Sequence, residues 1–136
     1  MSLNKLRVVV GIVLDSSQRV LISQRTAGKH LAGLWEFPGG KIEPKETQLA
    51  ALAREFKEEL NLDVESAHFL FTVDHVYPEK AVALEIFLVD EYRGVANGME
   101  GQSLHWCPIA NLGEFSFPEA NVDIVKYLQE HYGQRW

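Results

Sequence analysis

Three glutamates, Glu55, Glu58 and Glu59, are spaced so that one α-helix would place them on a narrow strip. A helix turns by about 100° per residue, so the three side chains fall within an arc of about 100°. Carboxylates that close together can share a cation. Because an oxygen-only ligand set suits a hard divalent ion, we predict bound Mg²⁺, with Mn²⁺ as the alternative.

Histidine does not compete for this assignment. The five histidines, at positions 30, 68, 75, 105 and 131, have no spacing typical of a zinc site. The other interpretation of an acidic run is an exposed helix face. Like charges at neighbouring helical positions cost about 0.2–0.5 kcal/mol per pair, and the macrodipole disfavours anions near a C-terminus. The three glutamates therefore destabilise the helix that carries them, so we favour a binding site over an exposed helix face.

The residues around the strip predict a strand, a glycine loop and a capped helix. Residues 35–37 form a short aromatic run, which Pro38-Gly39-Gly40 ends because glycine adopts conformations closed to other residues. Thr47, or Glu46 before it, can begin the helix. Apolar residues recur at helical spacing beside the strip, and we predict that they form the buried face of the helix. They are Leu49, Leu52, Ala53, Phe56 and Leu60.

This whole segment resembles the Nudix box. Gly40 is followed after five residues by Glu46, after seven more by Arg54-Glu55-Phe56, and then by Glu58-Glu59 and Asn61-Leu62. A pattern that fixes so many positions is far more specific than a lone glycine motif. The family usually has glycine where this chain has Asn61. Asparagine also tolerates the left-handed conformation, so we expect the helix to end there.

The resemblance implies the Nudix fold, an α/β fold with a mixed β-sheet sandwiched between α-helices. Residues 6–14 and 19–24 are β-branched runs around Asp15-Ser16-Ser17, which predicts a hairpin. Further strands are expected at 64–76, 81–92 and 104–107. A closing helix is expected at 121–132, where apolar residues recur at helical spacing.

Composition limits the organisation of the chain. With 136 residues, of which 46% are hydrophobic, we predict one domain over residues 1–136. No secretory signal and no apolar run near the ~18 residues of a membrane span are found, so we expect a cytoplasmic protein with no membrane partner. Cys107 is the only cysteine, and its place between Trp106 and Pro108 favours buried packing over chemistry.

The net charge of −6 argues against nonspecific binding to a nucleic-acid polymer, which needs a basic surface. A small phosphorylated substrate escapes this objection, because a bound metal and a few local cations can reverse the sign of the charge. We expect a monomer that acts on a small nucleoside triphosphate.

The resemblance also implies residue roles in metal-assisted phosphoanhydride hydrolysis. Glu55 is the expected general base or water-orienting residue, Glu58 and Glu59 are the principal metal ligands, and the Gly39 carbonyl is a further ligand. A metal at this place can stabilise charge at phosphorus and lower the pKa of water. Arg54 is expected to orient the cluster.

Arg54 and Glu100 each have a plainer alternative. The guanidinium of Arg54 can hold a carboxylate such as Glu46, and the alternative is a surface salt bridge. Glu100 alone would be taken for an exposed turn residue. The chain also resembles the MutT-like branch of the Nudix family, and this resemblance implies that an acid in the Glu100-Gly101-Gln102 context completes the metal site.

The likeness to the MutT-like branch covers nearly the whole chain. Its segments are residues 9–12, 22–25, 34–42, 100–102 and 117–121. Proteins of this branch hydrolyse 8-oxo-dGTP to 8-oxo-dGMP and pyrophosphate, by attack at the β-phosphorus, and so remove an oxidised precursor before DNA replication. We expect this activity here, and we expect it to contribute to DNA repair by keeping the oxidised nucleotide out of DNA. The alternatives are a CTP, dCTP or other nucleoside triphosphate pyrophosphohydrolase and a non-catalytic nucleotide-binding module.

Asn121 is expected to recognise the base. Guanine presents two acceptors, N7 and O6, whereas 8-oxoguanine carries hydrogen on N7 and presents a donor beside an acceptor. A carboxamide complements the second pattern and not the first. The alternative is that Asn121 only caps the C-terminal helix.

The other substrate-binding residues implied by the resemblance are Arg25, Phe37, Gly40, Lys41, Tyr77 and Lys80. Arg25 would meet the base or its sugar phosphate, with an exposed strand end as the alternative. Phe37 would line the base pocket, with the core as the alternative. Lys80, beside Ala81, stands where an arginine is usual. Lysine lacks the planar fork of arginine, so we expect looser closure over the base.

Overall fold

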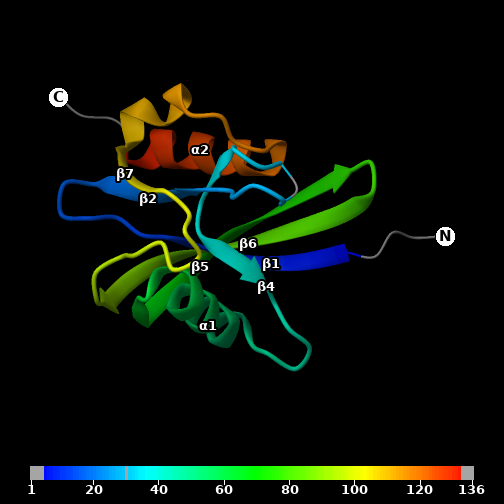
Figure 1. The fold of residues 1–136 in the computed structure, drawn as a ribbon, viewed down its shortest axis with the longest axis horizontal. Helices are drawn as coiled ribbons and strands as arrows, with labels where there is room; N and C mark the ends of the chain where they lie inside the picture. Colours follow the sequence, from blue (N-terminus) through cyan, green and yellow to red (C-terminus); the bar gives the residue numbers. More distant parts are fainter. Residues whose placement is uncertain (1–4, 30, 133–136) are drawn as a thin grey trace.

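The computed structural model describes residues 5–29 and 31–132. Figure 1 shows strands between two helices, α1 on one side and α2 on the other. The elements are β1 (Lys5–Ile12), β2 (Arg19–Gln24), β3 (Trp35–Glu36), β4 (Gly39–Lys41), α1 (Gln48–Leu60), β5 (Asp63–Tyr77), β6 (Lys80–Arg93), β7 (Leu104–Pro108), the 3-10 helix η1 (Ile109–Glu114) and α2 (Glu119–His131).

The apolar run of β1 does not alternate with polar residues because both faces of its sheet are covered. The order is β4-β1-β6-β5, with β1 parallel to β6 and the other neighbours antiparallel. Val10 packs in the cluster that contains Ile124 of α2, and Val9 packs in the cluster that contains Phe56 of α1. Successive strand residues point to opposite faces, so β1 contributes to both cores. The predicted mixed sheet between helices is confirmed.

The predicted hairpin of residues 6–14 and 19–24 is wrong beyond its turn. Asp15 Oδ1 accepts hydrogen bonds from the backbone N–H groups of Ser17 at 2.9 Å and Arg19 at 2.8 Å, and Leu14 forms an isolated bridge with Val20. The two strands then separate. β2 joins a second sheet of order β3-β2-β7, while β1 stays with β4 and β6. Pairing with distant partners replaces the local pairing.

Helix α1 begins and ends where its cap residues predict. Thr47 is the N-cap, and its Oγ1 accepts from Ala50 N–H at 3.1 Å. Asn61 ends the helix at φ 57° and ψ 35°, the left-handed conformation expected of it. Most of the predicted stripe is buried, but Leu49 is 51% exposed, so the buried face begins only at Ala51.

The second core lies between the sheets and α2. Ile124 and Leu128 of α2 are fully buried against residues of β1 and β2. Cys107 belongs to the same cluster, and burial raises the pKa of its thiol. Its predicted packing role is confirmed. In the described part of the chain, no helix is both long enough and apolar enough to cross a membrane.

Candidate active site

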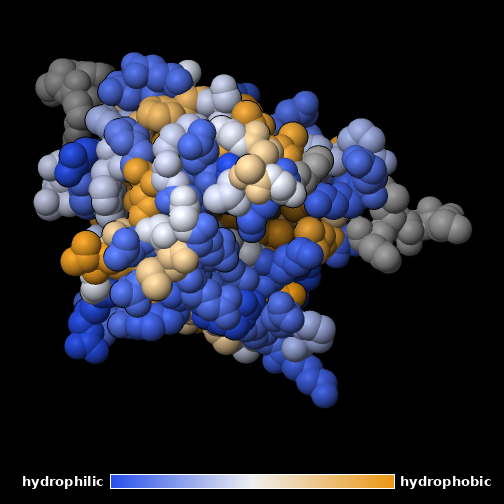
Figure 2. Space-filling view, viewed as in Figure 1, coloured by the Kyte–Doolittle hydropathy of each residue, from blue (hydrophilic) through white to orange (hydrophobic). Residues whose placement is uncertain are grey.

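A cavity of about 460 Å³ opens between α1 and the first turn of α2. Its lining also comes from β1, β4, the loop after β2 and the tip of the β5–β6 hairpin. In the space-filling view, hydrophilic residues cover α1, and apolar residues come to the surface in the hollow between the two helices (Figure 2). The cavity thus has an acidic side on α1 and a more apolar side toward α2.

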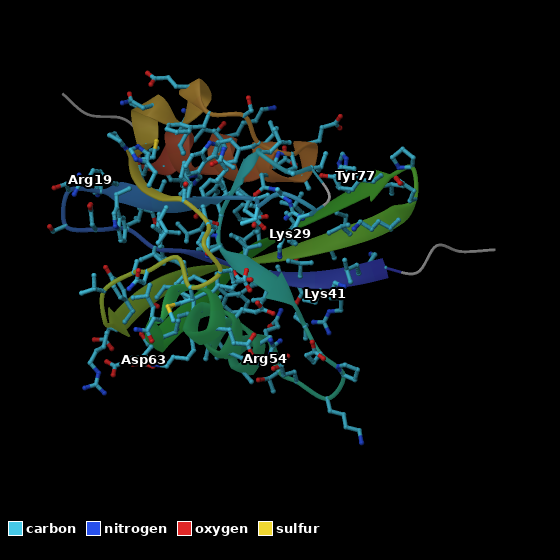
Figure 3. The ribbon with its side chains drawn as sticks, viewed as in Figure 1. Arg19, Lys29, Lys41, Arg54, Asp63 and Tyr77 are labelled. Carbon is cyan, nitrogen blue, oxygen red and sulfur yellow. The ribbon has the colours of Figure 1, made fainter. Side chains whose placement is uncertain are left out.

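Most of the predicted site residues meet in this cavity. It is lined by Arg25, Gly40, Lys41, Glu55, Glu58, Glu59, Tyr77, Lys80, Glu100 and Asn121. In Figure 3, Lys41 on β4 lies between Lys29 above it and Arg54 on α1 below it. Segments that are far apart in the sequence therefore converge on one hollow.

Phe37, Gly39 and Arg54 do not line the cavity. The Phe37 side chain is 3% exposed and stacks on Phe117, with ring centroids 5.3 Å apart, so the core alternative describes its position. Gly39 pairs with Val10 in the sheet. Arg54 lies behind the acidic strip, and its effect on the cavity passes through the groups that it holds.

Arg54 joins the segment after the two glycines to the acidic strip of α1. Its Nε and Nη2 donate to the two carboxylate oxygens of Glu46 at 2.6 and 2.9 Å, and Nη2 also donates to the Lys41 carbonyl at 3.0 Å. Its Nη1 donates to Glu55 at 2.9 Å and to Glu58 at 3.4 Å. The hydrogen bond from Arg54 lowers the pKa of Glu46 to about 2. The predicted contact with Glu46 is confirmed. That Arg54 orients the cluster stays a prediction.

Gly40 is the residue that lets Glu55 lie against the loop. A Cβ atom at Gly40 would overlap the carboxyl group of Glu55. At Gly39, the same atom would overlap the backbone carbonyl of Val9. Gly40 therefore allows the Glu55 side chain to approach the backbone, and Gly39 allows the neighbouring strand β1 to approach it.

The carboxylates of the acidic strip are near one another but do not form a finished metal centre. Among residues 5–29 and 31–132, no three acidic, histidine or cysteine side chains converge on one ion position. Glu55 and Glu58 both form ion pairs with Arg54, at 2.9 and 3.4 Å. The ion pairs with Arg54 account for this arrangement.

The charge of the cluster nevertheless fits a divalent cation. Burial, with smaller contributions from Glu55, Glu100 and Glu36, raises the pKa of Glu59 to about 9. A carboxylate surrounded by others gains most from a nearby cation, and oxygen donors suit a hard ion. Glu55, Glu58, Glu59 and Glu100 would be its ligands.

We expect the metal-free protein to lose stability as the pH rises. Unfolded Glu59 releases its proton near 4.5, whereas folded Glu59 keeps it to about 9. Between these values the folded state binds more protons, so the free energy of unfolding falls by up to about 1.4 kcal/mol per pH unit. Urea denaturation between pH 5 and pH 9 with EDTA would measure the slope, and saturating Mg²⁺ should flatten it. An equal slope in Glu59→Gln would contradict the assignment.

The loop that carries Glu100 is fixed to the end of α1. Gln102 Nε2 donates to the Glu59 carbonyl at 3.0 Å, and Met99 N–H donates to the same carbonyl at 3.0 Å. The N–H of Glu100 donates to Gln102 Oε1 at 2.9 Å. These bonds explain how an acid distant in sequence comes to the acidic strip. The predicted Glu-Gly-Gln context therefore has a structural reason.

Asn121 does not cap α2. The N-cap is Pro118, and Asn121 lies within the first turn, where its side chain is 8% exposed. Its Oδ1 accepts a hydrogen bond from the Phe37 N–H at 3.5 Å. This contact distinguishes the oxygen of the carboxamide from its nitrogen, and the nitrogen points away from the Phe37 N–H. A carbonyl oxygen has two lone pairs, so Oδ1 can accept a second hydrogen bond. The helix-cap alternative is wrong, and base recognition stays a prediction.

Three charged residues of the cavity were not predicted, and they are Lys29, Glu36 and Glu43. Glu36 pairs with Arg25 at 2.6 Å, and burial raises its pKa. Lys29 lies 3.9 Å from Glu100 and also lines the cavity. Strand alternation beside the aromatic Trp35 and Phe37 is a signal that could have placed Glu36 opposite the core. Lys29 is a loop lysine with no comparable signal. His30 lies outside the described residues.

The fold and the cavity define an α/β protein with an acidic helix strip facing several cations. The family described as NUDIX domain matches residues 9–127. The chain is 40% identical to the "8-oxo-dGTP diphosphatase" of Proteus vulgaris, over 74% of this chain and 90% of that protein. It is 32% identical to that of Escherichia coli, over 93% and 98%. The chain belongs to the NUDIX domain family.

Other similarities agree with this membership. A MutT structure, from a study of Aliivibrio salmonicida and Vibrio cholerae, has a TM-score of 0.82 and 32% identity, covering 95% of this chain and 100% of that one. The "CTP pyrophosphohydrolase" of Escherichia coli is 30% identical, over 90% of each chain. The predicted family and fold are confirmed.

Proposed function

We propose that this protein hydrolyses 8-oxo-dGTP to 8-oxo-dGMP and pyrophosphate, with Mg²⁺ as its metal and Mn²⁺ as a substitute. The observation that carries the proposal is one cavity that holds both the acidic strip and Asn121. The relatives named 8-oxo-dGTP diphosphatase support the same activity. Removal of an oxidised nucleotide before DNA synthesis follows from it as the biological role.

The acidic side of the cavity would perform the hydrolysis. A divalent metal held by the four glutamates would supply charge stabilisation at phosphorus and a water of lowered pKa. Glu55 takes the proton of the attacking water, while Arg54 fixes the position of that carboxylate. Water would attack the β-phosphorus, and the bond from that phosphorus to the oxygen that bridges to the α-phosphate would break. 8-oxo-dGMP departs with the bridging oxygen, and the β- and γ-phosphates, with the oxygen of the water, become pyrophosphate.

The cations around the acidic side would bind the triphosphate. Arg25, Lys29, Lys41 and Lys80 all line the cavity. Their charges offset part of the repulsion between the glutamates and the substrate. Lys80 is a point charge where the family usually has the planar fork of arginine, so it supports phosphate contact better than base stacking.

The carboxamide of Asn121 would select the oxidised base. Its oxygen accepts from N7–H and its nitrogen donates to O6, while ordinary guanine would place two acceptors face to face. A mispaired buried polar group costs about 1–3 kcal/mol. One such contact gives about a tenfold to hundredfold preference, so stronger selectivity needs further contacts.

We expect Asn121→Ala to lower the preference for 8-oxo-dGTP over dGTP by about tenfold to a hundredfold, for the reason given above. The Mg²⁺ concentration that gives half-maximal activity should change less. Steady-state kcat/KM for both nucleotides and an Mg²⁺ titration would measure the two effects. An unchanged substrate ratio would contradict base recognition by this residue.

A second candidate function is supported by the 30% identity to a CTP pyrophosphohydrolase. The acidic strip would serve either reaction, so the difference lies in the base. Comparison of kcat/KM for 8-oxo-dGTP, dGTP and CTP would separate the two functions. A preference for CTP would overturn the proposed substrate, and absence of turnover with Mg²⁺ would favour a non-catalytic nucleotide-binding module.

The remaining expectations belong to the same proposal. We propose a cytoplasmic monomer whose single domain spans residues 1–136 and which binds neither nucleic-acid polymers nor membranes. The net charge of −6 supports the absence of polymer binding. Light scattering at assay concentration would test the oligomeric state.

A further inference from the structure

The first turn of α2 is held by a side chain from outside the helix. Its N-cap, Pro118, makes no side-chain capping hydrogen bond. The N–H of Ala120 instead donates to the hydroxyl oxygen of Tyr77, at 3.2 Å. The first N–H groups of a helix have no partner within the helix, so the Tyr77 hydroxyl takes the place of an N-cap side chain.

A second contact joins the same two segments. His75 Nε2 lies 3.4 Å from Glu119 Oε2 at the start of α2. The His75 ring meets the Tyr77 ring edge to face, with centroids 4.5 Å apart. Residues two apart on a strand share a face, so β5 presents both side chains to α2. Figure 3 shows Tyr77 at the tip of the β5–β6 hairpin, near the start of α2.

These contacts lie next to Asn121. Ala120, which Tyr77 holds, immediately precedes it, and Tyr77 and Asn121 line the same cavity. The hydrogen bond from Phe37 N–H to Asn121 Oδ1 is 3.5 Å long, at the outer limit for such a bond. That bond is too weak to fix the carboxamide by itself. The position of the first turn therefore matters for the direction in which Asn121 points.

We propose that Tyr77 is a positioning residue for base selection. Its hydroxyl fixes the first turn of α2 through Ala120, and so directs the Asn121 carboxamide toward the base. His75 and Glu119 hold the Tyr77 ring in place for this contact. The proposal rests on the proposed function, because it needs Asn121 to meet the base. It adds an indirect effect to the substrate contact that the resemblance implies for Tyr77.

The test is Tyr77→Phe, which removes the hydroxyl and keeps the ring. We expect the ratio of kcat/KM for 8-oxo-dGTP to that for dGTP to fall about three- to tenfold, equivalent to about 0.6–1.4 kcal/mol. The Ala120 amide should exchange its hydrogen faster by NMR, since its partner is gone. Tyr127→Phe, which removes a hydroxyl from α2 away from the cavity, is the matched control and should change neither quantity.

A double-mutant cycle shows whether Tyr77 acts through Asn121. In the Asn121→Ala background, Tyr77→Phe should leave the substrate ratio unchanged. An equal fall in both backgrounds would mean a direct base contact and would overturn the proposal, as would an unchanged ratio when Asn121 is present. Unaltered Ala120 exchange would overturn the hydrogen bond itself. A wild-type protein without preference for 8-oxo-dGTP would overturn the proposed function and this inference together.

Discussion

Glu55→Gln is expected to lower kcat at saturating Mg²⁺ by about a hundredfold to ten-thousandfold, the usual contribution of a general base. The glutamine keeps the shape of the side chain but cannot take the proton of the attacking water. Glu55 lines the cavity and is held by Arg54 at 2.9 Å, so its position is fixed before substrate binds. Steady-state kinetics at several Mg²⁺ concentrations would measure the loss.

Glu58→Gln should act differently, because Glu58 is proposed as a metal ligand. Its side chain is 60% exposed and its ion pair with Arg54 is the longer one, at 3.4 Å. We expect at least a tenfold rise in the Mg²⁺ concentration needed for half-maximal activity, together with loss of turnover at ordinary Mg²⁺. Glu130→Gln, an exposed carboxylate on α2, serves as the control. Persistent activity in both Glu55→Gln and Glu58→Gln would discredit the site.

The parts of the fold that were predicted correctly depend on local chemistry. Thr47 and Asn61 bound α1 because a side-chain oxygen caps its start and a left-handed residue ends it. The common face of the three glutamates follows from their spacing and from helix geometry alone. Arg54 could be assigned to Glu46 because both belong to the same recognisable segment. Each of these features is fixed by residues within one stretch of the chain.

The parts that were missed depend on contacts between distant segments. The separation of β1 from β2 follows from pairing with β6 and β7, which no local pattern shows. Leu49 fits the apolar stripe, yet it is 51% exposed because burial depends on what covers each turn. Lys29 meets Glu100 at 3.9 Å although the two residues are distant in the sequence, and the loop of Glu100 is itself bound to the end of α1. The Tyr77 contact with α2 is of the same kind.

Gly40→Ala should reduce activity strongly while leaving the protein folded. The new Cβ would overlap the Glu55 carboxyl group, which is the far end of a flexible side chain and can move at small cost in stability. That group is the proposed base, and a shift of about 1 Å at a catalytic group can cost about a hundredfold in rate. We therefore expect a fall of that size in kcat/KM, with thermal unfolding close to that of the wild type.

Gly39→Ala provides the contrast, because the same added atom meets backbone instead of side chain. It would overlap the carbonyl oxygen of Val9, on the strand that pairs with β4. Backbone of a paired strand cannot move aside without loss of its hydrogen bonds, so overpacking here should cost about 1–3 kcal/mol of stability. Thermal denaturation and kcat/KM of both variants would separate the two effects. If Gly40→Ala kept full activity, the close approach of Glu55 to the glycine loop would not matter for catalysis, and Glu55 would lose its assignment as the base.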